Sequence, residues 1–354
     1  MSTQTLDTEV MKNLLAQHEA VTGKAPKVKG SPPVITIREG YKAFSDVFGF
    51  SPPSGVDHEV RQFVDEDWPE NMRIHIPPVD DGYVFPPDAT EMAAHAFQCG
   101  EKLLAYGPKG SGKSSLLKEI CARLRMPFIR INGRADMESS AIFGTIDPST
   151  MTWKPGPAEE LARYGGVLCV DEISLLPAGI NMSMQYMLEE NGKVYLADKP
   201  GSSDEKTVTP HEWFRVVATD NTQLQGDTSG RYVGAQVQNE AMLDRFGTTI
   251  ELTYLSSKHE TDLLKSRCTG LDHQVAADMV RFASIVRDMY DKGNVQFTLS
   301  PRSLILWGRK VAYWKNTQRA FFYTFYNKLI DSDRKQVAEA YHKVFGKDVI
   351  NFAY

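Results

Sequence analysis

Eight consecutive residues indicate the class of this protein: Gly107-Pro108-Lys109-Gly110-Ser111-Gly112-Lys113-Ser114. The stretch matches the pattern G-x-x-x-x-G-K-[ST], whose glycines let the backbone turn its N–H groups inward around phosphate oxygens. The apolar run Leu103–Tyr106 before it predicts a strand, and residues 114–124 after it predict a helix. Because a helix N-terminus carries partial positive charge, it strengthens such a site. The stretch therefore predicts a loop that binds nucleotide phosphates.

The residues of this loop have distinct expected roles. Lys113 should meet the β- and γ-phosphates of ATP, and the hydroxyl of Ser114 should bind Mg²⁺. An ordinary glycine-rich turn before a helix is the alternative, but it explains neither the lysine nor the hydroxyl. The predicted nucleotide-binding residues are Gly107, Gly110, Ser111, Gly112, Lys113, Ser114 and Ser115.

A second motif follows about sixty residues later, at residues 166–172 (Gly-Val-Leu-Cys-Val-Asp-Glu). Its four apolar residues predict a buried strand, so Asp171 should emerge at the carboxyl end of that strand. There it would bind Mg²⁺ or its water together with Ser114, and Glu172 would polarise an attacking water. An acidic pair after a strand is often surface chemistry when it stands alone, but its spacing from the phosphate loop favours function.

A third polar group follows the apolar run at residues 214–218, in Thr219-Asp220-Asn221. If this strand lies beside the strand of the phosphate loop, Asn221 could orient the lytic water, although asparagine after a strand is also a common turn former. The chain has no Asn/Thr-Lys-x-Asp motif, which a GTPase would need, and a small-molecule kinase has no reason to carry the acidic pair. These two classes of P-loop protein are therefore disfavoured.

The order of apolar patterns predicts an α/β fold. Five short apolar runs alternate with helical patterns, which is the signature of a parallel sheet covered by helices on both faces. The runs are residues 103–106, 128–131, 167–170, 214–218 and 248–252. After Leu255 only helical patterns remain, and one helix has a core stripe. The stripe residues are Val275, Met279, Phe282, Val286 and Met289, and further helices are expected at 302–314, 319–330 and 334–345.

Length and composition limit the remaining possibilities. The chain has 354 residues, 42% of them hydrophobic and 24% charged, and a net charge of -5, which argues against a dedicated nucleic-acid binder. No apolar run approaches the roughly 20 residues of a membrane span, so we expect a cytoplasmic protein. Four widely spaced cysteines indicate neither a disulfide framework nor a zinc site. We expect a proline-rich leader at 1–84, with a short helix within 1–23, an ATPase domain at 85–255 and a helical lid at 256–354.

Several segments together carry a resemblance to a known family. The segments are 218–222 (Ala-Thr-Asp-Asn-Thr), 226–234 (Gly-Asp-Thr-Ser-Gly-Arg-Tyr-Val-Gly) and 239–246 (Asn-Glu-Ala-Met-Leu-Asp-Arg-Phe), with shorter matches at 47–50, 153–157 and 298–302. They resemble the MoxR branch of the AAA+ proteins, and within it the CobS-like subunits of cobaltochelatase. The resemblance extends from about residue 40 onward.

This resemblance implies a P-loop AAA+ sheet with a helical lid, assembled as a ring, usually a hexamer, with ATP and Mg²⁺ between subunits. Asn221 matches the sensor-1 position, Arg245 the arginine finger that reaches the next subunit, and Arg302 the sensor-2 arginine of the lid. Arg231 is a weaker alternative for either arginine role. An ion pair with Asp244 is the alternative for Arg245, and plain solvation is the alternative for Arg302.

The resemblance also implies a protein partner with a von Willebrand factor A domain, which the ring remodels or activates. In its most specific form it implies that the ring belongs to a metal-chelatase-type complex. We identify no tetrapyrrole or cobalt site in the sequence. A nucleic-acid motor of the helicase type and a non-hydrolysing scaffold are the alternatives. Trp153 lies where this branch inserts a hairpin, and it is expected either to contact a partner or to pack against its own domain.

Overall fold

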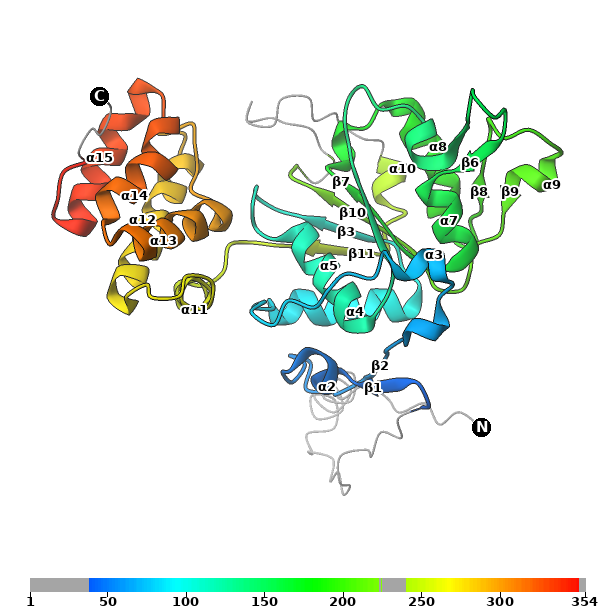
Figure 1. Ribbon diagram of the computed structural model, residues 1–354, viewed down its shortest axis with the longest axis horizontal. Coiled ribbons are helices and arrows are strands. Elements are labelled where there is room, and N and C mark those ends of the chain that lie inside the picture. Colours follow the sequence, from blue (N-terminus) through cyan, green and yellow to red (C-terminus); the bar gives the residue numbers. More distant parts are fainter. Residues whose placement is uncertain (1–37, 223, 225–239, 350–354) are drawn as a thin grey trace, which may run out of the picture.

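The computed structural model describes residues 38–222, 224 and 240–349, and the statements below concern these residues (Figure 1). The predicted short helix within 1–23, the resemblance segment 226–234 and Arg231 lie outside them. None of the described helices is long and apolar enough to cross a membrane.

The body of the protein is a five-stranded sheet with the order β11-β3-β10-β7-β4, in which every neighbouring pair is parallel. The strands are β3 (Leu103–Tyr106), β4 (Phe128–Asn132), β7 (Gly166–Asp171), β10 (Phe214–Asp220) and β11 (Thr248–Glu251). The five predicted runs are thereby confirmed as strands of one parallel sheet. Residues 166–170 are all buried, as expected for a strand with both faces covered.

Helices surround this sheet, and two of them, α4 and α5, lie below it in the view of Figure 1. The longer helices of the body are α4 (Pro87–Cys99), α5 (Lys113–Leu124), α7 (Pro157–Tyr164) and α8 (Ala178–Leu188). Smaller elements are α6 (Ser140–Phe143), β5 (Gly144–Ile146), β6 (Trp153–Pro155), η2 (Ile173–Leu175), β8 (Val194–Tyr195), α9 (Ser203–Lys206), β9 (Thr207–Val208) and α10 (Glu240–Leu243). The pairs β5–β6 and β8–β9 are antiparallel; β5 and β6 form a hairpin, whereas α9 lies between β8 and β9.

The described part of the proline-rich segment is built from short elements that pack on the body. They are β1 (Tyr41–Ala43), α2 (Phe44–Phe48), β2 (Glu59–Arg61), η1 (Asp65–Asp67) and α3 (Glu70–Arg73). Phe44, Trp68 and Met72 are buried in the same hydrophobic cluster as the sheet. The indole N–H of Trp68 donates to the carbonyl of Arg125 at 2.8 Å, just after α5. This segment therefore shares the core of the sheet.

The carboxyl-terminal region is helical and has a hydrophobic cluster of its own. Its elements are α11 (Ser257–Arg267), α12 (His273–Asp291), α13 (Pro301–Trp314), α14 (Thr317–Thr324), η3 (Tyr326–Lys328) and α15 (Asp331–Phe345). The predicted stripe lies on α12, where Met279, Phe282 and Val286 are fully buried. The helix expected at 319–330 is shorter, because the chain turns at Phe325 into the 3₁₀ turn η3, which places Phe325 and Leu329 in the lid core.

Candidate nucleotide site

Sheet topology brings the three sequence motifs to one edge. β10 lies between β3 and β7, with Asp220 opposite Tyr106 and Ala218 opposite Val170. Because the strands are parallel, the phosphate loop after β3, the acidic pair at the end of β7 and the polar residues that end β10 all emerge at the same carboxyl edge. The expectation that the strand at 214–218 lies beside the phosphate-loop strand is confirmed.

The loop between β3 and α5 has a backbone that requires glycine. Gly107 has φ +143°, and a Cβ there would collide with the carbonyl oxygen of Leu252. Gly110 has φ +80°, and a Cβ there would lie 2.6 Å from the Cβ of Ser300 in the lid. Among the described residues, no side chain caps the N-terminus of α5, and the buried hydroxyl of Ser111 has no hydrogen-bond partner. Unpaired donors at a helix N-terminus fit an anionic phosphate ligand.

Lys113, the first residue of α5, points back into this loop. Its side chain is only 7% exposed, and Nζ donates to the carbonyl oxygens of Gly107 at 2.8 Å and Pro108 at 3.1 Å and to Oδ1 of Asn221 at 2.8 Å. Burial lowers the pKa of Lys113 to about 8, and the nearby carboxylates only partly oppose this. The lysine is thus a buried cation whose hydrogen-bond partners are all neutral, which suits it to receive a phosphate oxygen.

Asp171 and Ser114 form the oxygen-rich part of the site. Oδ1 of Asp171 accepts hydrogen bonds from Oγ of Ser114 at 2.6 Å and from Oγ1 of Thr219, while Nη1 of Arg130 lies 3.5 Å from Oδ2. Mg²⁺ prefers oxygen ligands and is usually held by one or two protein groups together with phosphates and waters. A serine hydroxyl in contact with a carboxylate at the phosphate loop fits that requirement, so Ser114 and Asp171 could hold the ion.

Glu172 is presented by an unusual backbone conformation and is joined to Asn221. Its φ is +56°, in the left-handed region, and its N–H donates to Oγ1 of Thr219 at 3.2 Å. Nδ2 of Asn221 lies 3.4 Å from Oε1 of Glu172. The structure thus brings Lys113, Asn221 and Glu172 into one connected polar group. A carboxylate at this position could accept a proton from water, and the amide could orient that water.

Arg245, just after α10, is not brought to the phosphate loop of its own chain. Nη2 lies 3.5 Å from Oε1 of Glu189, and Nη1 donates to the carbonyl of Ala241. Arg245 therefore forms its ion pair with Glu189. The sequence had suggested an ion pair with Asp244 as the alternative to the arginine-finger role.

Arg302 lies in the first turn of α13 and is exposed. This turn begins at Ser300, whose hydroxyl accepts from the N–H of Ser303 at 3.3 Å and whose Cβ faces Gly110. The helix that carries Arg302 therefore begins against the phosphate loop.

Trp153, on the β5–β6 hairpin, packs against its own domain. Its indole N–H donates to Oε2 of Glu159 at 2.6 Å, and the buried Glu159 also accepts from Arg163 at 2.8 Å and from Lys199 at 2.8 Å. Of the two expectations for Trp153, the structure favours internal packing.

Three residues of this site were not identified from sequence: Arg130, Thr219 and Asp220. Asp220 is fully buried, and its Oδ2 accepts from the N–H groups of Thr222 and Leu224, both at 2.8 Å. The polar pair before Asn221 was a visible signal for Thr219 and Asp220. Arg130 gave no signal, because its approach to Asp171 depends on β4 pairing with β7.

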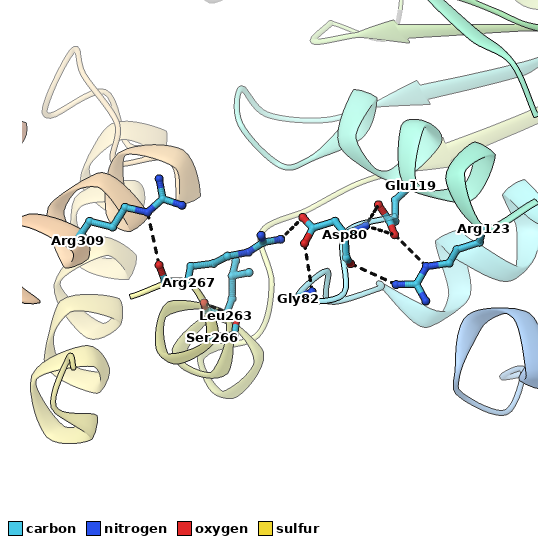
Figure 2. Close-up of polar contacts among 8 residues, drawn as sticks. All are labelled: Asp80, Gly82, Glu119, Arg123, Leu263, Ser266, Arg267 and Arg309. Atoms are coloured by element: carbon cyan, nitrogen blue, oxygen red, sulfur yellow. Dashed lines mark hydrogen bonds and ion pairs between the residues drawn. The ribbon is translucent and has the colours of Figure 1, made fainter. Parts of the chain in front are cut away.

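A polar network joins the phosphate-loop helix to the lid (Figure 2). Arg267 at the end of α11 forms an ion pair with Asp80, whose N–H donates to Oε1 of Glu119 on α5 at 3.1 Å. Arg123 donates to Oε1 of Glu119 at 2.9 Å and to the carbonyl of Asp80 at 3.2 Å. On the lid side, Nε of Arg309 lies 3.5 Å from the carbonyl oxygen of Arg267. Figure 2 shows these side chains in one line from α5 to the lid.

Two family models match the chain in succession. Residues 102–246 match the AAA domain of the dynein-related subfamily, and residues 260–347 match the CbbQ/NirQ/NorQ C-terminal region.

Individual proteins match over different extents. The aerobic cobaltochelatase subunit CobS of Sinorhizobium sp is 29% identical over 77% of this chain and 83% of its own length. Midasin of Giardia intestinalis is 28% identical over 48% of this chain, which is 3% of that protein. Among solved structures, the RuvB Holliday junction branch migration motor of Thermotoga maritima is 15% identical, covers 78% of this chain and 82% of its own, and has a TM-score of 0.47.

Proposed function

Because this chain is a MoxR-like AAA+ protein that resembles CobS, we propose that it binds ATP with Mg²⁺ and hydrolyses the γ-phosphate. One observation carries the proposal: Lys113, the Ser114–Asp171 pair and Glu172 meet at one sheet edge, where Asn221 contacts both Lys113 and Glu172. Phosphate binding alone would need the loop and the lysine, but a glutamate joined to the same amide provides for water activation.

Each residue has a defined task in this proposal. The N–H groups of the loop and Lys113 bind the β- and γ-phosphates, and Ser114 and Asp171 hold Mg²⁺, which neutralises phosphate charge. Glu172 accepts the proton of the attacking water, and Asn221 orients that water toward phosphorus. Binding of the phosphates would also give Lys113 an anionic partner in place of the two loop carbonyls.

We further propose that the sites work between subunits of a ring, a hexamer by analogy with the family. Arg245 has no described contact with its own phosphate loop, which suits a role toward a neighbour's γ-phosphate. Arg302 would link the lid to the nucleotide, since its helix begins against Gly110. The division into a leader at 1–84, an ATPase domain at 85–255 and a lid at 256–354 is part of this proposal.

The proposed use of ATP turnover is to remodel or activate a protein partner. The similarity to a cobaltochelatase subunit supports a partner with a von Willebrand factor A domain and, as a narrower proposal, a metal-chelatase-type complex. ATPase rates measured with such a partner from the same genome and with single-stranded DNA test this. Stimulation by the partner supports it, and stimulation by DNA alone would favour a nucleic-acid motor.

The hydrolytic site is tested by separating binding from turnover. Lys113→Ala should weaken ATP binding at least tenfold, whereas Glu172→Gln should keep ATP affinity within about threefold and lose at least 90% of turnover. Lys109→Ala changes an exposed lysine of the same loop and should leave both nearly unchanged. If Glu172→Gln hydrolyses ATP at the wild-type rate, the role of Glu172 is wrong.

A further inference from the structure

One buried hydroxyl touches both acidic residues of the nucleotide site. Thr219 lies in β10 between β3 and β7 and is 0% exposed. Its Oγ1 donates to Oδ1 of Asp171 and accepts from the N–H of Glu172 at 3.2 Å. A hydroxyl has one proton and two lone pairs, so it can make both bonds at once. The Thr219 side chain, on β10, thus connects the carboxylate of Asp171 with the backbone of Glu172.

The backbone that this hydroxyl holds is strained. Glu172 has φ +56° and ψ +51°, a left-handed conformation that costs a residue with a Cβ about 1–2 kcal/mol. On the other side of the turn, the N–H of Gly133 donates to the carbonyl of Asp171 at 2.7 Å. The turn is therefore held from both neighbouring strands, from β10 by a side chain and from the end of β4 by the backbone. Without the Thr219 hydroxyl, one of these two restraints is lost.

The position of this turn decides where two functional side chains point. Asp171 also accepts from Ser114 at 2.6 Å, but the Ser114 hydroxyl is needed for Mg²⁺ when nucleotide binds. Thr219 has no such second task, so it can orient Asp171 both with and without the ion. The N–H that donates to Thr219 belongs to Glu172 itself. A shift of the Glu172 backbone therefore also moves the carboxylate of Glu172 relative to Asn221.

From this geometry we propose that Thr219 is a positioning residue of the ATPase site, where it orients Asp171 for Mg²⁺ and Glu172 for water activation. The proposal rests on the proposed ATPase function. It predicts that the hydroxyl, and not the shape of the side chain, is required. Removing a group that orients a metal ligand in this way typically lowers metal affinity or activity by about 10- to 100-fold.

The test compares Thr219→Val, which keeps the shape and removes the hydroxyl, with Thr219→Ser, which keeps the hydroxyl. In Thr219→Val we expect kcat to fall about tenfold or more, and the Mg²⁺ concentration for half-maximal ATPγS binding to rise about tenfold. Nucleotide affinity measured in EDTA should stay within about twofold, because Lys113 and the loop do not depend on Thr219. Thr219→Ser should keep all three values within about threefold. Thermal unfolding of both variants checks the fold, and Thr219→Ala replaces valine if that variant does not fold.

The inference is overturned if the valine variant keeps the wild-type kcat and Mg²⁺ dependence, or if serine and valine lose them equally. A loss of affinity in EDTA as large as that in Mg²⁺ would also overturn it, since a merely structural defect acts on both. If the wild-type chain binds ATPγS but does not hydrolyse ATP, the proposed function fails instead. The Mg²⁺ titration of binding then still tests the role of Thr219.

Discussion

Lys113 shows how a single buried charge prepares the site for its ligand. Burial lowers its pKa to about 8, although Asp171, Asp220 and Glu172 act in the opposite direction. Phosphates add negative charge next to Nζ and must raise this pKa in the complex. Below about pH 8 the lysine is protonated with or without ATP, so no proton is exchanged there. Above it, ATP binding should take up a proton, and affinity should decrease as the pH rises.

The proton uptake can be measured directly. Titration calorimetry near pH 9 in two buffers of different ionisation enthalpy should give about half a proton or more taken up per ATP bound. Lys113→Arg keeps its charge throughout this range and should show no uptake from this position. Equal uptake in the arginine variant would assign the proton to another group.

The polar network between α5 and the lid contains two interactions of unequal strength, the ion pair of Asp80 with Arg267 and the hydrogen bonds that Glu119 accepts. The ion pair of Asp80 with Arg267 is partly exposed, with side chains 40% and 26% accessible, so it should contribute less than about 1 kcal/mol. Glu119 is 4% exposed and accepts from the Asp80 N–H and from Arg123. Its removal leaves two partly buried donors without this acceptor, at a cost of about 1–3 kcal/mol.

Urea unfolding should therefore rank two variants in this network. Asp80→Asn should lower the free energy of unfolding by less than about 1 kcal/mol, and Glu119→Ala by about 1–3 kcal/mol. Arg267 lowers the pKa of Asp80 below its usual 3.8, so the ion pair contributes fully above that pH and is lost as the pH falls through the lowered pKa. An Asp80→Asn effect as large as that of Glu119→Ala would contradict this ranking, and an Arg267→Ala double-mutant cycle isolates the pair.

At the scale of the whole molecule, the described residues form two hydrophobic clusters, one around the sheet and one in the lid, and the phosphate loop contacts the start of α13. Arg245 lies elsewhere, paired with Glu189. If Arg245 serves a neighbouring subunit, inactive Arg245→Ala and inactive Lys113→Ala chains should regain activity when mixed. Some interfaces then combine an intact Arg245 with an intact Lys113.

ATPase activity over a series of mixing ratios measures this complementation, and the mass of the assemblies confirms that mixed rings form. A peak of activity at intermediate ratios is expected, because the number of competent interfaces is largest there. Mixing Lys113→Ala with Glu172→Gln serves as the control, since both defects lie at the same phosphate site. Mixed rings that stay inactive at every ratio would show that Arg245 does not act between subunits.

Local patterns were sufficient to predict the five strands, the strand–loop–helix order around residues 107–114, the place of Asp171 at the end of β7 and the helical region after Leu255. These features depend on residues close together in sequence: an apolar run predicts a strand, and the pattern G-x-x-x-x-G-K-[ST] between a strand and a helix predicts a phosphate loop. For the same reason the helix ending at Thr324 was predicted too long, because its end depends on how Phe325 packs in the lid core.

Contacts between distant residues came only from the tertiary structure. The pairing of Arg245 with Glu189, of Trp153 with Glu159 and of Arg267 with Asp80 depends on which elements pack together. Thr219 is the clearest example, since a threonine in a buried strand becomes the anchor of two acids only because β10 pairs with β7. Strand order results from the burial of whole faces against each other, and that free energy is spread over the entire core, so no short stretch of sequence contains it.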